Sequence, residues 1–437
     1  MTPAGRLAAA IEVLREIEDR HKPARLALKA WGDSARYAGS KDRAWVSGLV
    51  LDCLRLRRSL AWRMGEETPR AVALAALRFS WDWSTDQIAE AAAGAPHGPG
   101  VLSQAEAKAL AAPRALDDAP DAVRGDYPDW LDGPLGRVFG EARAAEGAEL
   151  ARRAPVDLRV NRLKCDADRA LKLLTPFGAE PSAILADALR IAAPQSAERA
   201  APVENEPEFA KGWFEVQDLG SQIAAAAASV VKGQQVLDLC AGGGGKTLAL
   251  AAAMGSSGQI YAYDSDSKRL SEVVTRSQRA GVRNLQVRSP RQPEPLHGLE
   301  GRMDLVFVDA PCTGSGVWRR HPDAKWRLTP AQLERRRQEQ RAVLAQARAM
   351  VRPGGRIVYV TCSLLAEENE DQVSAFLGSA GGFAIVPALA AVEASGLATA
   401  HGLQVLAPCV TSEGVLRLSP RASGTDGFFV AVLQRRP

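Results

Sequence analysis

The second half of the chain alternates short apolar runs with amphipathic stretches, and this alternation restricts the possible folds more than any other feature. After Val216, strands are expected at residues 235–239, 259–264, 285–288, 305–309, 356–361 and 427–433. Helices are expected between them, at residues 248–254, 268–280 and 330–351. Continuous apolar strands separated by helices are typical of parallel sheets that are covered on both faces. The pattern therefore predicts an α/β fold with a doubly wound, mainly parallel sheet.

Two further regions precede this sheet, which we assign to residues 216–437. Residues 1–145 place apolar side chains at intervals of three and four, with no alternating strand pattern, so an all-helical domain is expected. Residues 146–215 contain the alternating stretch 156–161 followed by helical spacing over 166–174, which predicts a small α/β subdomain and a linker. A chain of 437 residues fits such a division because it is too long for one ordinary core.

Composition excludes several classes of protein. With 46% hydrophobic and 24% charged residues, the chain has the balance of a globular protein. Its six cysteines are scattered without paired spacing, so neither a metal site nor a disulfide framework is expected. The first residues lack the apolar core of a signal peptide, and the alanine-rich run 223–231 is shorter than a membrane span, so we predict a cytoplasmic protein without membrane contact. A net charge of +4 permits an acidic partner such as nucleic acid without requiring one.

A glycine-rich stretch, residues 238–247, joins the first strand of the predicted sheet to a helix. Its four consecutive glycines let the backbone approach a ligand closely, and the helix amino terminus offers unpaired N–H groups. A Walker phosphate loop would need glycine at position 240, where the chain has Cys240, and a dinucleotide fingerprint would need a final glycine that is missing. We therefore predict a site for S-adenosylmethionine, with Asp264 at the end of the second strand binding the ribose hydroxyls. The alternative is a glycine-rich turn without a ligand.

Two cysteines follow directly after strands that we expect to be neighbours. Cys312 ends the sequence Asp-Ala-Pro-Cys at residues 309–312, and Cys362 lies in Thr-Cys-Ser at residues 361–363. A single cysteine near a strand is ordinarily a small buried hydrophobe, but two with polar neighbours at the ligand-binding edge favour a site. Beside an activated methyl group, they suit methylation at carbon 5 of a pyrimidine. One thiolate adds to carbon 6, a carboxyl stabilises the developing charge, and the other thiol helps to remove the carbon 5 proton.

Taken together, residues 240–247, 309–316 and 361–363 resemble the motifs of the RNA cytosine-C5 methyltransferases of the RsmB/Sun type. The resemblance implies that Cys362 is the nucleophile and that Cys312 assists product release. It further implies that Asp309 and Lys246 contact the base or help catalysis. It implies a Rossmann-like methyltransferase sheet with S-adenosylmethionine as cofactor. The implied cofactor contacts are Cys240, Ala241, Gly242, Gly243, Gly244, Gly245, Lys246, Asp264 and Asp309.

The resemblance extends over most of the chain. It includes residues 316–323 after the second motif, residues 216–218 and the closing stretch 425–429. The helical amino-terminal region, with Gly-Ser-Lys-Asp-Arg at 39–43, is similar to the NusB-like RNA-binding domain of the bacterial branch that acts on small-subunit ribosomal RNA. The expected protein is a monomeric enzyme that makes 5-methylcytosine in 16S ribosomal RNA. The alternatives are a transfer RNA methyltransferase and a non-catalytic RNA-binding ribosome assembly factor.

Contacts to RNA are predicted at two places. Arg319 and Arg320 lie just beyond the predicted catalytic loop, which favours phosphate contacts over a plain solvated position. Arg159 and Asn161 match the subdomain that precedes the sheet in the family. A further basic cluster, Lys41, Arg43, Arg55, Arg57 and Arg58, is either a solvated helix face, which the charge pattern favours, or a phosphate-binding surface.

The chain departs from the family pattern at two positions. Gly242 and Gly243 stand where family members usually have Ala-Pro, which predicts a more flexible loop before the ligand binds. Ser289 stands near the end of the third strand, where an acidic residue is usual, so weaker recognition of adenine is expected.

Overall fold

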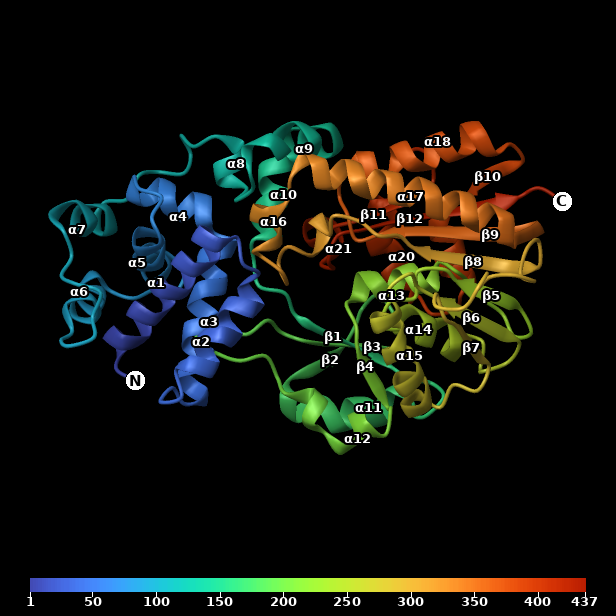
Figure 1. The fold of residues 1–437 in the computed structure, drawn as a ribbon, viewed down its shortest axis with the longest axis horizontal. Helices are drawn as coiled ribbons and strands as arrows, with labels where there is room; N and C mark the ends of the chain where they lie inside the picture. The colour runs from blue at the N-terminus through green and yellow to red at the C-terminus, as the bar shows by residue number, and fades with distance from the viewer. The chain divides into compact units, whose positions relative to one another are not determined.

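The computed structural model describes residues 1–437, which form two compact units (Figure 1). The helical unit comprises Met1–Ala154, Ala193–Ala200 and Trp318–Leu328. The sheet unit comprises Pro155–Ala192, Ala201–Val317 and Thr329–Pro437. These units differ from the expected boundaries at residues 145 and 215. The helical unit takes in two segments from later in the chain, and the small sheet shares a unit with the large one.

The helical unit is built from the amphipathic segments that the sequence predicts. Its helices are α1 (Pro3–Arg20), α2 (Ala24–Ser34), α3 (Ser40–Arg55), α4 (Arg57–Met64), α5 (Pro69–Phe79), α6 (Thr85–Ala93), α7 (Gln104–Ala111), α8 (Asp121–Arg124), α9 (Asp132–Phe139), α10 (Arg143–Leu150) and α16 (Ala324–Arg327). The hydroxyls of Thr2 and Thr68 cap the amino termini of α1 and α5, each followed by a proline that suits the first helical turn. Helices α1, α3 and α5 pack against one another around fully buried Leu7, Leu49 and Leu74.

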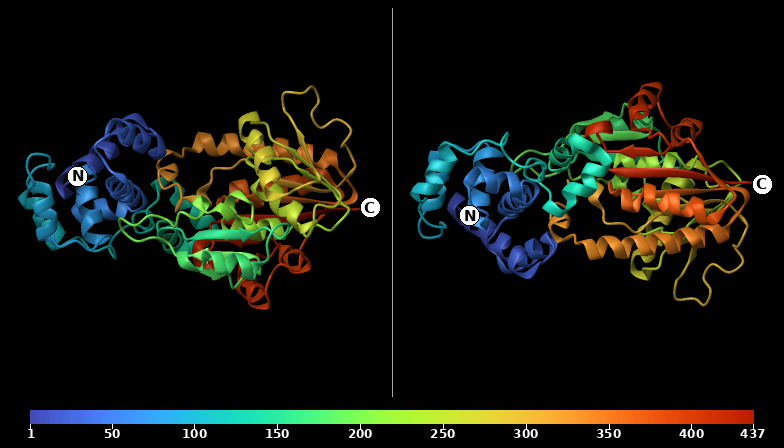
Figure 2. Two further views of the ribbon diagram at one scale, coloured as in Figure 1. Left: turned by 90° about the horizontal axis from the view of Figure 1, so that it is seen from below. Right: turned by 90° about the horizontal axis from the view of Figure 1, so that it is seen from above.

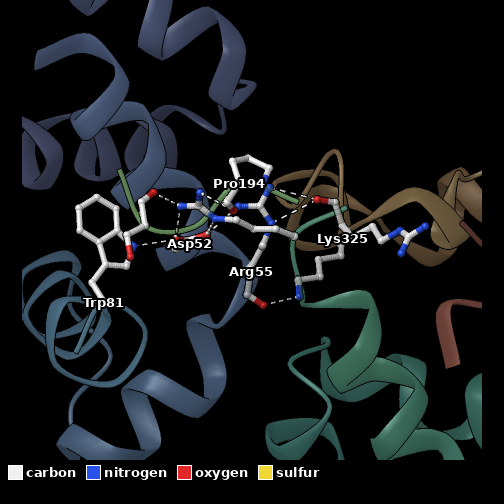
Figure 3. Close-up of polar contacts among 8 residues, drawn as sticks. Asp52, Arg55, Trp81, Pro194 and Lys325 are labelled. Carbon is white, nitrogen blue, oxygen red and sulfur yellow. Dashed lines mark hydrogen bonds and ion pairs between the residues drawn. The ribbon is translucent and has the colours of Figure 1, made fainter. Parts of the chain in front are cut away.

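The segment Trp318–Leu328 is held by the carboxyl end of α3 (Figure 3). The buried Lys325 ammonium donates to the main-chain carbonyl of Arg55 at 2.7 Å, and the Trp326 indole donates to the main-chain carbonyl of Leu54 at 2.6 Å. Carbonyls in the last turn of a helix lack partners within the helix, so these contacts satisfy them. In return, the Arg55 guanidinium donates twice to the carbonyl of Arg319, at 3.2 and 3.1 Å. The segment is thus fixed by buried polar contacts.

One buried carboxylate joins these helices to the other distant segment of the unit (Figure 3). Asp52 accepts hydrogen bonds from Arg55 at 2.8 Å, from the Trp81 indole at 2.8 Å, and from two nitrogens of Arg153 at 3.0 and 2.6 Å. Arg153 also donates to the carbonyls of Pro194 and Ser196. Asp52 therefore pairs with two guanidinium groups, and these bind separate parts of the chain.

The small subdomain of the sheet unit is an antiparallel sheet with strand order β2-β3-β1-β4. Its elements are β1 (Val156–Val160), α11 (Ala167–Leu174), β2 (Ala179–Pro181), β3 (Ala188–Ile191), α12 (Pro207–Ala210) and β4 (Phe214–Val216). The alternation over 156–161 and the helical spacing over 166–174 correspond to β1 and α11. Leu158, Val160 and Phe214 pack with α11 in a separate small core.

The large sheet has the order β10-β12-β9-β8-β5-β6-β7, with β11 paired to β12. Its strands are β5 (Gln235–Asp238), β6 (Gln259–Tyr263), β7 (Leu285–Arg288), β8 (Met303–Asp309), β9 (Val351–Thr361), β10 (Phe383–Val386), β11 (Leu416–Leu418) and β12 (Phe428–Arg435). Strands β5 to β9 pair in parallel, whereas β10, β11 and β12 pair antiparallel. The predicted doubly wound, mainly parallel sheet is confirmed, although β10 and β11 were not predicted.

Helices cover both faces of this sheet (Figures 1 and 2). Successive residues of β9 point to opposite sides: Val358 packs with α13 (Leu219–Ala226) and α14 (Gly245–Ala253), and Tyr359 packs with α17 (Pro330–Met350) and α18 (Glu370–Ala380). Helix α15 (Ser267–Ala280) covers β6 and β7, and α19 (Ala388–Ala394), α20 (Ala400–Leu406) and α21 (Pro420–Ser423) follow β10. No helix combines the length and apolar character that a bilayer crossing requires. The central strands are therefore buried, and their carboxyl ends are left to carry polar residues.

Candidate active site

The two predicted thiols meet at one edge of the sheet. Strands β8 and β9 are parallel neighbours, so the residues that follow them lie side by side, as expected. The sulfur atoms of Cys312 and Cys362 are 3.4 Å apart, and both residues are partly exposed. The hydrogen bond with Cys362, together with burial, raises the pKa of the Cys312 thiol well above its usual value. The pair can therefore exchange a proton while remaining open to a ligand.

Lys246 and Asp309 form an ion pair at the same edge. Their nitrogen and oxygen atoms are 2.6 Å apart, and the Lys246 ammonium lies 5.3 Å from the centre of the Phe428 ring. Burial alone would lower the pKa of Lys246, but the charge and hydrogen bond of Asp309 raise it above its usual value. The lysine side chain is 12% exposed and the aspartate side chain 32% exposed. Lys246 thus remains protonated and orients a carboxylate that a substrate can still reach.

The glycine-rich loop between β5 and α14 is fastened by side chains. Gly242 and Gly244 have positive φ angles of 53° and 84°, which glycine adopts without strain. The Asp264 carboxylate accepts a hydrogen bond from the N–H of Gly242 at 2.7 Å, and Arg276 donates to the carbonyl of Gly243 at 2.6 Å. A Cβ atom added at Gly242 would lie 2.6 Å from the Arg269 guanidinium. These contacts fasten the loop, and its glycines pack closely against side chains of α15.

Asp238, at the end of β5, is a buried acid that sequence reasoning used only to mark the end of the strand. One of its oxygens accepts a hydrogen bond from the Thr247 hydroxyl at 2.6 Å, and the other has no partner. Burial raises the pKa of Asp238 to about 7, against the opposing effect of Thr247. The loop is thus anchored to a carboxyl group that is costly to ionise.

We expect Asp238→Asn to change how the stability of the sheet unit depends on pH. The folded pKa lies above the usual value, so ionisation favours the unfolded chain, and wild-type stability falls as pH rises toward about 7. Asparagine can still accept from Thr247 but has no charge. The free energy of unfolding of the variant, relative to that of the wild type, should therefore increase by about 2 kcal/mol from about pH 5 to pH 7. Denaturant titrations at the two pH values measure this difference. If the difference in free energy of unfolding between variant and wild type does not change with pH, the pKa of Asp238 is not raised.

Arg159 and Asn161, which we predicted to contact RNA, have their side chains inside the sheet unit. The Asn161 amide donates to the carbonyls of Gly212 and Ala280, both at 2.8 Å. Arg159 donates to Gln217 at 2.7 Å. Both residues are buried, so their contacts favour a structural role, and an RNA contact stays a prediction.

Several basic residues of the helical unit pair with acidic residues of the same unit. Arg319 is buried, and Arg320 is partly exposed. In the basic cluster, Arg55 binds Asp52, Arg57 pairs with Glu18 and Glu67, and Arg58 pairs with Asp129. Arg43 donates to the carbonyls of Ala38 and Ala35, whereas Lys41 is exposed. The choice between a solvated helix face and a phosphate-binding surface stays open for this cluster. The predicted RNA contacts of Arg319 and Arg320 stay predictions.

The loops that carry the two thiols are fastened by buried polar residues that sequence reasoning missed. Asn369 accepts from the Thr361 hydroxyl at 2.5 Å and donates to the carbonyl of Ser363 at 2.9 Å. Glu368 binds the loop of Cys312, as described below. The acidic run at residues 367–370 resembles an ordinary solvated helix start, so its position shortly after the Thr-Cys-Ser motif was the only available signal.

The chain is similar in sequence to several known proteins. A family model described as "16S rRNA methyltransferase RsmB/F" matches residues 225–434. Ribosomal RNA small subunit methyltransferase B of Citrobacter koseri is 33% identical over 342 residues, which cover 77% of this chain and 72% of that protein. The protein of the same name from Klebsiella pneumoniae subsp. pneumoniae is 34% identical over 313 residues. That match covers 71% of this chain and 66% of the relative, slightly less than two thirds of its length.

Solved structures share the fold. PH0851 superposes with a TM-score of 0.72 and 24% identity, covering 100% of this chain and 99% of its own. A methyltransferase homolog protein from Pyrococcus horikoshii has a TM-score of 0.56 and 25% identity, covering 72% of this chain and 97% of its own. These structures show the fold alone, and it is the sequence matches that establish that the chain belongs to the RsmB/F family of 16S rRNA methyltransferases.

Proposed function

We propose that this protein transfers a methyl group from S-adenosylmethionine to carbon 5 of a cytosine in RNA, through a covalent bond between Cys362 and carbon 6. The observation that carries the proposal is the pair of thiols 3.4 Å apart at the edge that also holds Lys246 and Asp309. The names of the relatives favour 16S ribosomal RNA as the substrate. The family and the helical unit favour it over transfer RNA.

The glycine-rich loop fits the proposed cofactor. S-adenosylmethionine carries a carboxylate and ribose hydroxyls, and when bound it supplies the activated methyl group. Residues 242–245 carry no side chains of their own that could cover the backbone N–H groups, and the amino terminus of α14 favours a carboxylate. Asp264 accepts two backbone hydrogen bonds, but a carboxylate has about four acceptor positions and can still accept from ribose hydroxyls.

The side chains at the sheet edge that carries Cys312, Cys362, Lys246 and Asp309, here called the thiol edge, have separate roles in the reaction. The Cys362 thiolate adds to carbon 6, and the electrons of the carbon 5–carbon 6 double bond make carbon 5 nucleophilic. Asp309, oriented by Lys246, accepts a hydrogen bond from the exocyclic amine of the base. The base must leave its stack to reach Cys362, which requires an unpaired or openable RNA segment.

Cys312 completes the reaction. After methylation, carbon 5 carries both a methyl group and a proton. When the proton leaves, the electrons of the carbon–hydrogen bond restore the double bond, and the Cys362 thiolate is expelled. Cys312 accepts this proton as a thiolate. The hydrogen bond with Cys362 and burial raise the pKa of the Cys312 thiol well above its usual value, so the partly exposed thiol must first lose its own proton to solvent, which leaves a strong base.

Nucleoside mass spectrometry tests the proposal directly. The protein is incubated with S-adenosylmethionine and with unmethylated 16S ribosomal RNA, assembling small subunits or transfer RNA, and the RNA is then digested to nucleosides. We expect 5-methylcytosine in ribosomal RNA with the wild type and none with Cys362→Ser. If only transfer RNA is methylated, the substrate is transfer RNA and not 16S ribosomal RNA. RNA binding without any methylation would instead indicate an assembly factor.

A further inference from the structure

A fully buried carboxylate lies behind the loop that carries Cys312. Glu368 ends the short 3-10 helix Ala366–Glu368, just before α18, and it is not exposed at all. Its main-chain carbonyl accepts a hydrogen bond from the buried Tyr359 hydroxyl at 2.6 Å, which fixes the residue against β9. A buried carboxylate is costly unless its oxygens are satisfied, so the partners of this side chain indicate what it holds.

Two of those partners belong to the turn that follows Cys312. One Glu368 oxygen accepts from the backbone N–H of Thr313 at 2.8 Å, and the other accepts from the Thr313 hydroxyl at 2.5 Å. Thr313 is the residue directly after the cysteine. Two hydrogen bonds to one residue fix both its backbone and its side chain, and thereby the direction in which the Cys312 side chain leaves the backbone.

A second buried residue closes the arrangement from α17. The Gln340 amide donates to Glu368 at 3.1 Å and to the carbonyl of Pro311 at 2.9 Å, so it holds the residue directly before Cys312. Glu368 and Gln340 thus hydrogen-bond the residues on both sides of Cys312, Thr313 and Pro311. The opposite thiol, Cys362, belongs to a different loop. Glu368 also accepts a hydrogen bond from the side chain of Ser363, directly after Cys362, but Asn369 holds that loop independently through the carbonyl of Ser363. Loss of Glu368 should therefore affect Cys312 more than Cys362.

We propose that Glu368 is a positioning residue for product release, because it holds the Pro311–Thr313 turn so that the Cys312 sulfur stays beside Cys362. This inference rests on the proposed function. Methyl transfer needs Cys362 and Asp309, which Glu368 does not contact through any of the hydrogen bonds above. The release step needs Cys312 at the right distance from carbon 5. Weakening the hydrogen bonds between Glu368 and Thr313 therefore slows product release more than methyl transfer.

The test is Glu368→Gln in the full-length protein, with RNA and S-adenosylmethionine. Glutamine keeps the size of the side chain but removes its charge and turns one of its two acceptors into a donor. The Thr313 hydroxyl must then accept from the amide instead of donating to a carboxylate, so the charge-assisted hydrogen bond is lost. In a single turnover, we expect methyl transfer within about threefold of the wild type. In multiple turnovers, we expect a loss of about tenfold or more, with a band of RNA–protein adduct on denaturing gels that the wild type does not accumulate.

Two further variants keep the result interpretable. Thr313→Val removes only the hydroxyl donor and should accumulate the adduct to a smaller extent, even if Glu368→Gln folds poorly. Glu370→Gln changes a nearby carboxylate that pairs with Arg417 outside this network, and it should accumulate none. Equal loss of methyl transfer and release, or wild-type turnover in both Glu368→Gln and Thr313→Val, would overturn the proposal. Failure of the wild type to methylate cytosine would instead count against the proposed function.

Discussion

Cys312→Ala is expected to leave the protein covalently joined to its RNA. Without the second thiol, Cys362 can still add to carbon 6 and methylation can proceed, but the carbon 5 proton is not removed and the carbon–sulfur bond persists. Incubation with S-adenosylmethionine and 16S ribosomal RNA should give a slow-migrating band on a denaturing gel. Overall turnover should fall by about 10³-fold or more, as for loss of a group that acts directly on the reacting atoms.

The double variant Cys312→Ala/Cys362→Ala is the matched control for this experiment. It should give no band and no methylation, because the attacking thiol is gone. A band that survives in the double variant, or one that forms with Cys362→Ala alone, would show that the two roles are reversed or that another nucleophile acts. The gel therefore tests the assignment of each thiol separately.

Asp52→Ala is expected to have the largest effect on stability. Asp52 is the carboxylate that neutralises Arg55 and Arg153 and accepts from the Trp81 indole (Figure 3). Removing it leaves two guanidinium groups with little access to water and without their counter-charge. Breaking a buried ion pair in this way costs about 3–5 kcal/mol. Chemical denaturation followed by tryptophan fluorescence should detect the loss, because Trp81 lies at the site.

Asp118→Ala provides the comparison, because Asp118 lies exposed in the loop before α8. Its effect on the free energy of unfolding should stay within about 0.5 kcal/mol. If both variants lose stability equally, or if Asp52→Ala unfolds like the wild type, the cluster does not hold the helical unit together.

The sequence allowed the sheet and much of the thiol edge to be predicted. Apolar strands such as β8 are long and uninterrupted, and the residue types after them restrict the chemistry, so the adjacency of Cys312 and Cys362 followed from the order of the strands. Strands β10 and β11 were missed because they are only four and three residues long, and β10 is in addition partly exposed. Strand β9 begins earlier than predicted, at Val351, since Pro353 and the glycines after it resemble a turn.

Features that depend on tertiary contacts could not be predicted in this way. Lys325 has the sequence context of an ordinary surface lysine, yet it is buried, and burial lowers its pKa to about 8. Glu368 likewise lies in an acidic run that gives no sign of burial. In both cases the decisive partner is distant in sequence: the carbonyl of Arg55 for the lysine and Thr313 for the glutamate. Local patterns carry no information about such pairs.

The helical unit is formed from three separate stretches of the chain, and this has a consequence for biosynthesis. A chain leaving the ribosome exposes α1 to α10 long before the segment Trp318–Leu328 has been made. Until then, the carbonyls at the end of α3 lack Lys325 and Trp326 as partners. The amino-terminal domain therefore cannot complete its native contacts first, as vectorial folding would ordinarily allow. It reaches its final state only after the glycine-rich loop and Cys312 have been synthesised.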